Sequence, residues 1–234
     1  MLRLENVSTA YDGVPMLRRV NIEVKKGELV CLLGPNGAGK TTTFRTLTGL
    51  IQPTGGKVWV KGQDVAQVGA ERLASLGVGL VPEGRRLFGG LTVEENLHLG
   101  WRAVGNRSNF SQDLERMCDL FPRIKERLYQ AAGTLSGGEQ AMVALARALI
   151  AEPDFVVMDE PSLGLSPLLI DEYFEITDRV RQQGTTVFLI EQNAKKALAI
   201  ADRAYFLLKG QVAASGDAED LQKNEAARAA YFAS

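Results

Sequence analysis

One glycine-rich stretch constrains the fold more than any other part of the chain. From Gly34 to Thr41 the sequence reads Gly-Pro-Asn-Gly-Ala-Gly-Lys-Thr. The run Glu28–Leu33 before it is short and apolar and predicts a buried strand, and Thr41–Leu47 predicts a helix that stops at Gly49. A loop of this kind between a strand and a helix is the context in which backbone N–H groups cradle phosphates. The sequence therefore predicts a polyphosphate site here.

The chemistry of this loop follows from its residue types. Glycines lack a Cβ, so the backbone adopts unusual φ values and approaches a polyphosphate closely, and the helix N-terminus adds a favourable dipole. Lys40 supplies a charge for the β- and γ-phosphates, and the Thr41 hydroxyl is a ligand for Mg²⁺. The residues expected to bind the polyphosphate are Gly34, Asn36, Gly37, Ala38, Gly39, Lys40, Thr41 and Thr42.

Composition limits the class of protein. The chain has 234 residues, 45% of them hydrophobic and 24% charged, and a net charge of −1. These values predict a single soluble domain with a sizeable core, and the lack of a basic excess means that no nucleic-acid partner is expected. No stretch approaches the ~20 apolar residues of a membrane span, and the N-terminus does not resemble a signal peptide.

Several short strands and a helical region surround the loop. Leu2–Val7 and Val20–Val24 alternate apolar and polar residues, and Gly56–Gly62 is a third bounded strand, which together predict an antiparallel layer. Tyr11 follows the first strand, either as an aromatic face for a base or as a strand-end residue with a hydrated hydroxyl. From about residue 92 to 132 the pattern is helical and predicts a subdomain. The tail Ala218–Tyr231 predicts a charged surface helix.

A second glycine motif lies in the middle of the chain. From Leu135 to Gln140 the sequence reads Leu-Ser-Gly-Gly-Glu-Gln, and the apolar helix Ala141–Ile150 is expected after it. Glycines and a serine at a helix start make an anion site by the same backbone logic. The alternative is a helix cap, with Ser136 as the N-cap residue.

Two strands are expected to end in polar side chains. Asp154–Glu160 is an apolar strand that ends in two carboxylates, and acids at the carboxyl end of a sheet strand lie where α/β proteins bind ligands. Asp159 is a candidate Mg²⁺ ligand, and Glu160 is a candidate base for an attacking water. The alternative is a solvated strand end. Gly184–Gln192 is a further buried strand with a polar end, and Leu76–Glu83 a strand that ends in a loop.

The order of these motifs resembles that in the nucleotide-binding subunits of ABC transporters, over nearly the whole chain. The stretches Val81–Phe88, Glu160–Leu165 and Glu191–Ala194 are similar to those of the ATPases of high-affinity branched-chain amino-acid importers, a pattern shared by amide and urea importers. The resemblance implies an α/β fold: a P-loop NTPase core with an antiparallel β layer and a helical subdomain at about 92–132. Residues 1–234 would form one ABC ATP-binding domain.

The resemblance also implies roles for particular residues. In this family two domains dimerise head to tail around two ATP molecules, so Tyr11 would stack on adenine and Glu160 would be the general base. Glu83 and Gln192 would assist catalysis. The implied Mg²⁺ ligands are Thr41, Glu83 and Asp159. The implied contacts to the partner's nucleotide are Ser136, Gly137, Gly138 and Glu139.

Three positions depart from the general family pattern. Glu83 stands where Gln is usual, Ser166 where Asp is usual, and Gln192 where His is usual. Glu83 adds charge, Ser166 removes a carboxylate from the dimer seam, and Gln192 keeps a donor but cannot act as a base. These departures bear on the efficiency of hydrolysis rather than on nucleotide binding, and they fit the narrower importer subgroup.

The expected function is that of a peripheral ATPase subunit at the cytoplasmic face of the inner membrane. It would bind ATP and Mg²⁺ and drive a separate membrane permease, with a second ATP-binding subunit of the same or a paralogous sequence. A periplasmic or extracellular solute-binding protein would be an indirect partner.

Of three alternative functions, the first lies within the same class and the other two belong to different classes. A non-transport ABC ATPase acting on DNA or ribosomes usually carries long coiled coils or a second cassette. A GTPase switch needs an Asn-Lys-x-Asp motif, and the sequence has none. An ATP-dependent closing module with little hydrolysis stays open because of Ser166 and Gln192.

Overall fold

The computed structural model describes residues 1–105 and 109–223, which contain two β-sheets. The smaller sheet is antiparallel and has the strand order β2-β1-β4-β5. Its strands are β1 (Leu2–Tyr11), β2 (Val14–Val24), β4 (Gly55–Val60) and β5 (Gln63–Asp64). This sheet is the antiparallel layer that the alternating patterns predict.

The larger sheet has the strand order β10-β9-β3-β8-β7-β6. Its strands are β3 (Leu29–Leu33), β6 (Val78–Val81), β7 (Phe155–Asp159), β8 (Thr186–Glu191), β9 (Arg203–Leu208) and β10 (Gln211–Asp217). All neighbours from β9 to β6 are parallel, and β10 pairs antiparallel with β9. Because parallel strands point the same way, the carboxyl ends of β3, β6, β7 and β8 lie along one edge.

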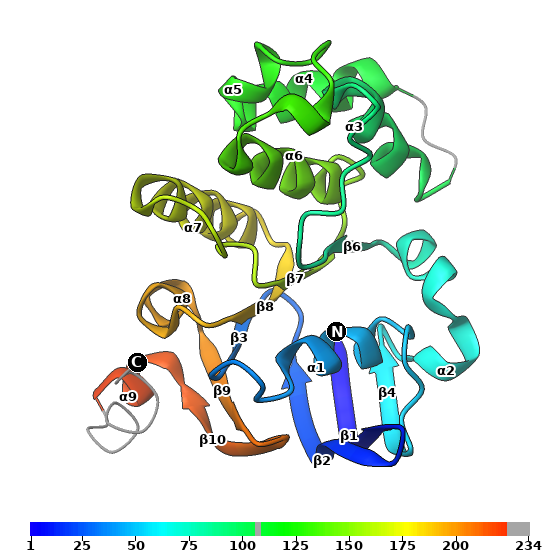
Figure 1. Cartoon of the computed structure of the whole chain (residues 1–234), viewed down its shortest axis with the longest axis vertical. Coiled ribbons are helices and arrows are strands. Elements are labelled where there is room, and N and C mark those ends of the chain that lie inside the picture. The colour runs from blue at the N-terminus through cyan, green and yellow to red at the C-terminus, as the bar shows by residue number, and fades with distance from the viewer. Residues whose placement is uncertain (106–108, 224–234) are drawn as a thin grey trace.

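The helices lie at both ends of the molecule and beside the larger sheet. Their bounds are α1 (Lys40–Leu47), α2 (Val65–Val68), α3 (Val93–Arg102), α4 (Phe110–Leu120), α5 (Pro122–Lys125), α6 (Gly137–Leu149), α7 (Pro167–Gln182), α8 (Ala194–Ile200) and α9 (Ala218–Lys223). Short 3₁₀ turns occupy Ala70–Arg72, Ala74–Leu76 and Ala132–Thr134. Figure 1 shows α3 to α6 at one end and the smaller sheet with α1 at the other, and between them lie α7, α8 and the strands β6, β7 and β8 of the larger sheet. Among the described helices none is long and apolar enough to cross a membrane.

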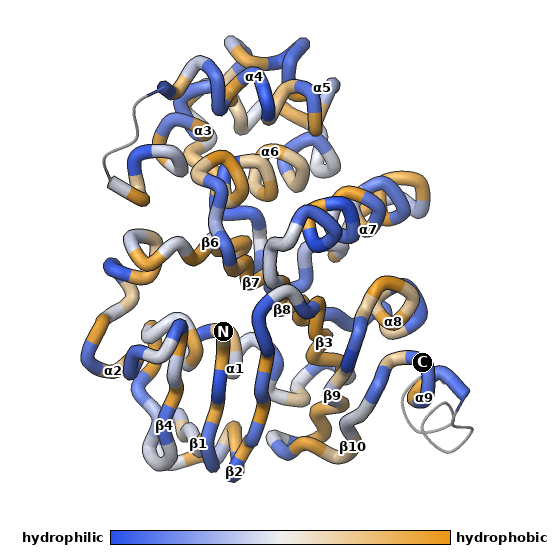
Figure 2. Tube along the Cα trace, turned by 180° about the vertical axis from the view of Figure 1, so that it is seen from behind, coloured by the Kyte–Doolittle hydropathy of each residue, from blue (hydrophilic) through white to orange (hydrophobic). Residues whose placement is uncertain are grey.

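The larger sheet is buried on both faces. Along β8, Val187 and Leu189 pack into a cluster with α6, α7 and α8, whereas Phe188 and Ile190 pack into a second cluster with α1 and the smaller sheet. Every residue of β3, β7 and β8 is therefore buried, which explains why these strands are continuous apolar runs. Figure 2 shows the contrasting alternation of hydrophobic and hydrophilic residues along β1 and β2.

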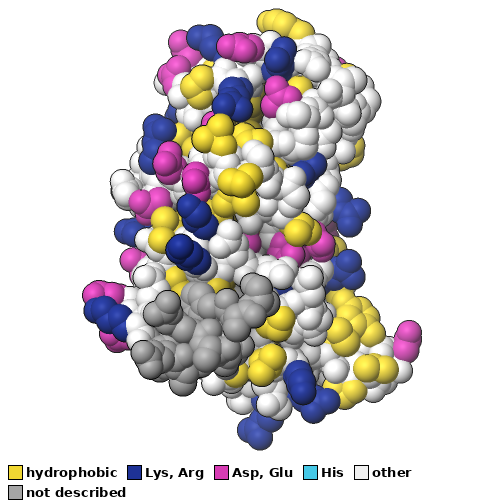
Figure 3. Space-filling view, turned by 60° about the vertical axis from the view of Figure 1, so that its left-hand side comes forward, with side chains coloured by type: hydrophobic (Ala, Val, Ile, Leu, Met, Phe, Trp, Pro, Cys, Tyr) yellow, Lys and Arg dark blue, Asp and Glu magenta, His cyan; other side chains and the backbone are white. Residues whose placement is uncertain are grey.

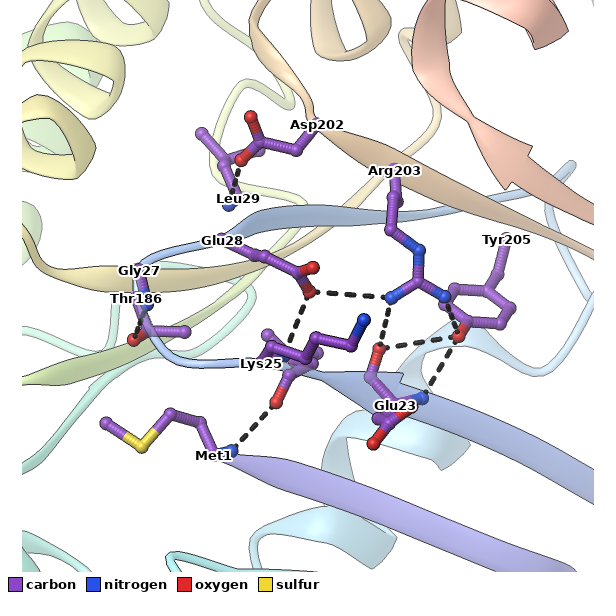
Figure 4. Close-up of polar contacts among 11 residues, drawn as sticks. Met1, Glu23, Lys25, Gly27, Glu28, Leu29, Thr186, Asp202, Arg203 and Tyr205 are labelled. Carbon is purple, nitrogen blue, oxygen red and sulfur yellow. Dashed lines mark hydrogen bonds and ion pairs between the residues drawn. The ribbon is translucent and has the colours of Figure 1, made fainter.

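Polar contacts join β2 of the smaller sheet to the larger sheet (Figure 4). The Tyr205 hydroxyl accepts hydrogen bonds from the Glu23 backbone N–H at 3.1 Å and from Arg203 Nη2 at 2.9 Å. In the turn before β3, the Gly27 N–H donates to Thr186 Oγ1 at 3.0 Å. The bond between Glu23 and Tyr205 thus joins β2 to β9, and the bond between Gly27 and Thr186 joins the turn before β3 to the first residue of β8.

Several element boundaries differ from the sequence prediction, and two of these differences have clear physical reasons. β1 continues past Val7 to Tyr11 through register shifts against β2, with Asn6 at φ 49°, so Tyr11 is the last residue of the strand rather than a residue after it. β6 is limited to Val78–Val81 because Gly77 at φ 77° breaks the strand before it and Pro82 follows.

The helical predictions also need adjustment. α6 begins at Gly137 rather than Ala141, because Ser136 caps it. Between 93 and 125 the chain forms α3, α4 and α5, and a separate subdomain at about 92–132 stays a prediction. α9 covers the start of the helix predicted over Ala218–Tyr231, and the remainder lies outside the described residues.

Candidate functional site

The four predicted site segments meet at the carboxyl edge of the larger sheet. Strand register places Leu33 beside Glu191, Ile190 beside Asp159, and Met158 beside Val81. The glycine loop, Gln192, Glu160 and Glu83 each follow one of these strand ends. Residues that are up to about 160 positions apart in the sequence therefore surround one site.

The glycine loop is shaped for close approach by a ligand. Gly37 and Gly39 have φ values of 77° and 110°, in the left-handed region that favours glycine. A Cβ on Gly34 would collide with the backbone carbonyl of Leu207, so only glycine fits there. Gly39 is the N-cap residue of α1, and the free N–H groups of the first turn face the loop.

Lys40 lies at the centre of the site. The residue is buried, and its Nζ donates to the carbonyls of Gly34 at 2.7 Å and Pro35 at 3.0 Å. The same Nζ lies 3.0 Å from Glu160 Oε1. The candidate phosphate ligand and the candidate base are thus in direct contact.

Glu160 has an unusual backbone conformation. Its φ is 47°, and its N–H donates to the carbonyl of Ile190 at 2.9 Å. A non-glycine residue in the left-handed region carries strain of about 1–3 kcal/mol, which persists only where the surrounding structure imposes it. Here the bond to β8 and the buried pair with Lys40 impose it.

Asp159 provides the best candidate for a metal ligand. Its side chain is 1% exposed, and its Oδ1 has no hydrogen-bond partner among the described residues. Burial, together with the negative charges of Glu83 and Glu160, raises the pKa of Asp159 from its ordinary value of 3.8 to about 7, against the lowering effect of Lys40. A buried carboxylate oxygen without a donor fits a hard cation such as Mg²⁺.

The remaining donors suit the same ion. Glu83 lines a pocket of about 240 Å³ together with Glu160, and Thr41 lies in the first turn of α1. The described residues contain no cluster of three or more His, Cys, Asp or Glu side chains arranged to hold a metal alone. An ion here would therefore complete its shell with phosphate oxygens and water, as Mg²⁺ commonly does at nucleotide sites.

Ser136 and Glu139 form a capping box at the start of α6. The Glu139 N–H donates to Ser136 Oγ at 3.3 Å, and the Ser136 N–H donates to Glu139 Oε2 at 2.9 Å. Hydrogen bonds from the Ser136 hydroxyl and backbone lower the pKa of Glu139. The helix-cap interpretation of Ser136 is confirmed within this chain, and a role toward a partner's nucleotide stays a prediction. A Cβ on Gly138 would meet the terminal methyl group of Leu169, so a larger residue there would require the leucine side chain to move.

The other predicted residues lie in different surroundings. Ala38 and Thr42 are both buried, and Ala38 packs into the apolar cluster with α1 and the smaller sheet. Asn36 and Gln192 are exposed, and Tyr11 is half-buried at the end of β1. Stacking of Tyr11 on adenine stays a prediction.

Sequence reasoning missed one residue, Glu191. It ends β8 with only 2% of its surface exposed, and its carboxylate accepts hydrogen bonds from three backbone N–H groups. The signal that identified Asp159, a carboxylate closing an apolar strand, would have identified Glu191 too.

Comparison with known proteins identifies the family of the chain. The ABC transporter family model matches residues 17–163, which is more than half of the chain. The chain belongs to the ABC transporter family. It is an ATPase with the ABC ATP-binding fold, as its motifs predict, and it is similar to branched-chain amino-acid transport ATP-binding proteins.

Its relatives in the family cover nearly the whole chain. The branched-chain amino acid transport ATP-binding protein BraG of Pseudomonas aeruginosa is 44% identical over 99% of both chains. The lipopolysaccharide export ATP-binding protein LptB of Escherichia coli is 32% identical over 99% of this chain and 96% of its own.

Solved structures agree with this assignment. The ATP-binding subunit of an ABC transporter superposes with a TM-score of 0.86 at 30% identity, covering 99% of this chain and 96% of its own. A dimeric cassette bound to ADP and Pi has a TM-score of 0.82 at 25% identity, covering 93% of this chain and 99% of its own.

Proposed function

We propose that this ABC ATPase powers the import of branched-chain or neutral amino acids, or of related amides, through a separate membrane permease. It would work at the cytoplasmic face of the inner membrane. The observation that carries the proposal is the joining of Lys40, Glu160 and Asp159 at one sheet edge, within a chain 44% identical to a branched-chain amino acid transport ATP-binding protein.

The residues of the site divide the hydrolysis of ATP among them. Lys40 and the glycine-loop N–H groups bind the β- and γ-phosphates, so that an incoming γ-phosphate competes with Glu160 for the Lys40 ammonium. Glu160 then accepts a proton from the water that attacks the γ-phosphorus. Gln192 donates an amide hydrogen bond to the γ-phosphate. It does not act as the base, because an amide does not accept the proton of the water.

Thr41, Glu83 and Asp159 would hold Mg²⁺, which neutralises charge on the phosphates when it is bound. Deprotonation of Asp159 goes with binding of the ion, because its pKa of about 7 leaves it partly protonated near neutral pH. Glu83 contributes a carboxylate from the loop after β6.

We further propose that two copies, or this chain and a paralogue, enclose the nucleotides between them. Residues Ser136 to Glu139 of one subunit would face the nucleotide bound by the glycine loop of the other. The free N–H groups at the start of α6 are suited to a phosphate, and the 13-residue length of α6 gives it a substantial dipole. A relative of known structure is a dimer bound to ADP and Pi, which supports this arrangement.

No nucleic-acid partner is proposed. The net charge is −1, and on the face drawn in Figure 3 basic and acidic side chains are interspersed. The family relatives named above are transport proteins, which favours a membrane permease as the partner.

Reconstitution tests the substrate class. The chain would be purified from native membranes with its associated subunits, the partners identified by mass spectrometry, and the complex placed in proteoliposomes with its solute-binding protein. We expect ATP-dependent uptake of leucine, isoleucine or valine, with no uptake by the Glu160→Gln complex. Uptake of urea or short amides alone would identify the chain as the ATPase of an amide or urea importer. ATP-dependent extraction of lipopolysaccharide would show that the chain drives export rather than import.

A further inference from the structure

The buried carboxylate of Glu191 connects two loops of the site. Its Oε1 accepts the N–H of Ser162 at 3.1 Å, and its Oε2 accepts the N–H groups of Gln192 at 3.0 Å and Asn193 at 3.3 Å. Each oxygen thus serves a different segment of the chain. Ser162 lies in the loop between β7 and α7, whereas Gln192 and Asn193 lead from β8 into α8.

Both segments carry a group of the proposed reaction. Ser162 is two residues after Glu160, and Gln192 is the candidate contact to the γ-phosphate. Glu160, Ser162, Glu191 and Gln192 all line one pocket of about 380 Å³. A shift of the Glu191 carboxylate would therefore move the base and the phosphate contact relative to each other.

Core packing alone does not account for a charge at this position. Burial raises the pKa of Glu191, and the hydrogen bonds from Ser162, Asn193 and Gln192 act in the opposite direction. A buried carboxylate is costly unless its oxygens are hydrogen-bonded, and here three donors converge on it. A glutamine has one acceptor oxygen and one amide donor, so it can serve only one of the two loops.

We propose that Glu191 is a positioning residue of the hydrolytic site. It fixes the backbone of Ser162, and through it Glu160, at a set distance from the backbone of Gln192. This proposal rests on the proposed ATPase function.

The first test compares Glu191→Gln with a matched variant, Asp202→Asn. Asp202 Oδ2 also accepts a backbone N–H, from Leu29 at 2.7 Å, but at the opposite end of β3 (Figure 4). We expect Glu191→Gln to lower kcat by about 10- to 100-fold, the loss that a misplaced catalytic group causes. Its Kd for ATP should stay within about threefold, because the glycine loop is intact. Asp202→Asn should keep its kcat.

A second readout does not depend on turnover. Hydrogen–deuterium exchange of the nucleotide-free protein should speed up in Glu191→Gln over 160–166, over 190–195, or over both, and in neither segment of Asp202→Asn. Unchanged exchange in both segments would overturn the linkage, even if kcat falls. A wild-type complex that hydrolyses no ATP would refute the proposed function, whereas the exchange result would still decide whether Glu191 holds the two loops.

A double-mutant cycle separates positioning from a general loss of stability. If Glu191 acts through Gln192, then Gln192→Ala should reduce kcat much less in the Glu191→Gln background than in the wild type. Multiplicative losses would exclude Gln192 as the group that Glu191 positions. Glu191→Asp keeps both oxygens and should recover part of kcat, and it replaces Glu191→Gln in the same measurements if the amide variant does not fold. A kcat within about twofold of wild type in both variants would overturn the proposal.

Discussion

Lys40 and Glu160 form a nearly dry ion pair, with Nζ and Oε1 3.0 Å apart and side chains only 3% and 9% exposed. Each charge is the other's principal compensation in this conformation. Removal of one partner from such a pair leaves an uncompensated buried charge, which usually costs about 3–5 kcal/mol. The pair therefore links the phosphate-binding residue to the base both energetically and geometrically.

Replacement of Glu160 by glutamine should keep the shape of the site and remove the proton acceptor. We expect kcat to fall by about 10²- to 10⁴-fold, while ATP still binds and a nucleotide-bound dimer accumulates. Single-turnover hydrolysis and size-exclusion chromatography measure these effects. Glu175→Gln, an exposed carboxylate on α7, is the matched control. Near-normal turnover of Glu160→Gln would rule out this residue as the base.

Replacement of Lys40 by alanine should weaken ATP binding, because a charge-assisted contact of about 1.5–3 kcal/mol is lost. It should also destabilise the nucleotide-free protein, since Glu160 is then buried without its partner. The double variant Lys40→Ala/Glu160→Gln should recover much of that stability but not ATP affinity. ATP titration and urea unfolding of Lys40→Ala, Glu160→Gln and the double variant measure ATP affinity and stability. ATP affinity and turnover of Lys40→Ala equal to those of the wild type would exclude Lys40 as a phosphate-binding residue.

Asp159 gives the stability a pH dependence of defined sign. The folded state holds the Asp159 proton up to a pKa of about 7, whereas the ordinary value is 3.8, so the free energy of unfolding falls as pH rises between these values. Asp159→Asn removes this effect. Without metal or nucleotide, the variant should be more stable than wild type by a few kcal/mol at pH 8 and by much less at pH 5.

Thermal unfolding at the two pH values measures this difference. Mg²⁺ with ATP should stabilise the wild type and should stabilise Asp159→Asn far less, because a neutral amide replaces the carboxylate. An equal offset at pH 5 and pH 8 would show that Asp159 is ionised in both states.

Ser136 can be tested separately as a helix cap and as a contact to a partner's nucleotide. Ser136→Asp keeps a good N-cap residue but places a negative charge at the start of α6, so stability should be retained while hydrolysis falls. Thr92→Ala removes the equivalent capping box of α3 and should cost about 1 kcal/mol without loss of turnover. Mixed dimers of a Ser136→Arg and a Lys40→Ala chain should hydrolyse at no more than one site. Normal hydrolysis by Ser136→Arg would reduce the motif to a cap.

Gln192 should contribute one neutral hydrogen bond. A loss of about 0.5–1.5 kcal/mol predicts a 2- to 13-fold lower kcat for Gln192→Ala, and Gln192→His should retain or raise activity. Steady-state ATPase rates with the native partner chains measure both. A loss as large as that of Glu160→Gln would contradict a sensing role, and an unchanged alanine variant would identify an ordinary solvated residue.

The sequence is most informative where one chemical requirement dictates several neighbouring residues. The glycine loop and its flanking strand and helix could be predicted because the positions of Gly34, Gly37 and Gly39 favour glycine. Each of these positions either has no room for a Cβ or has a left-handed φ value. The apolar runs of β3, β7 and β8 are recognisable because both faces of the sheet are covered.

Other features depend on contacts between distant segments and could not be predicted locally. The placement of β3 between β8 and β9 is set by packing along the whole sheet. The extension of β1 to Tyr11 depends on its register shifts against β2. The burial of Glu191 depends on a loop that begins about 30 residues earlier in the chain.

The left-handed backbone of Glu160 makes catalytic activity and thermal stability conflicting requirements at this position. Asparagine or glycine adopts φ near 47° with less strain than glutamate does, so either substitution relieves the local conformation while abolishing a proton acceptor. Either substitution alone also leaves Lys40 buried without its partner. A library selected only for resistance to heat should therefore accumulate substitutions at position 160 together with a neutral residue at position 40, whereas a library selected for growth on a transported solute should keep both residues. The proposed proton acceptor is thus also a residue with a strained backbone conformation.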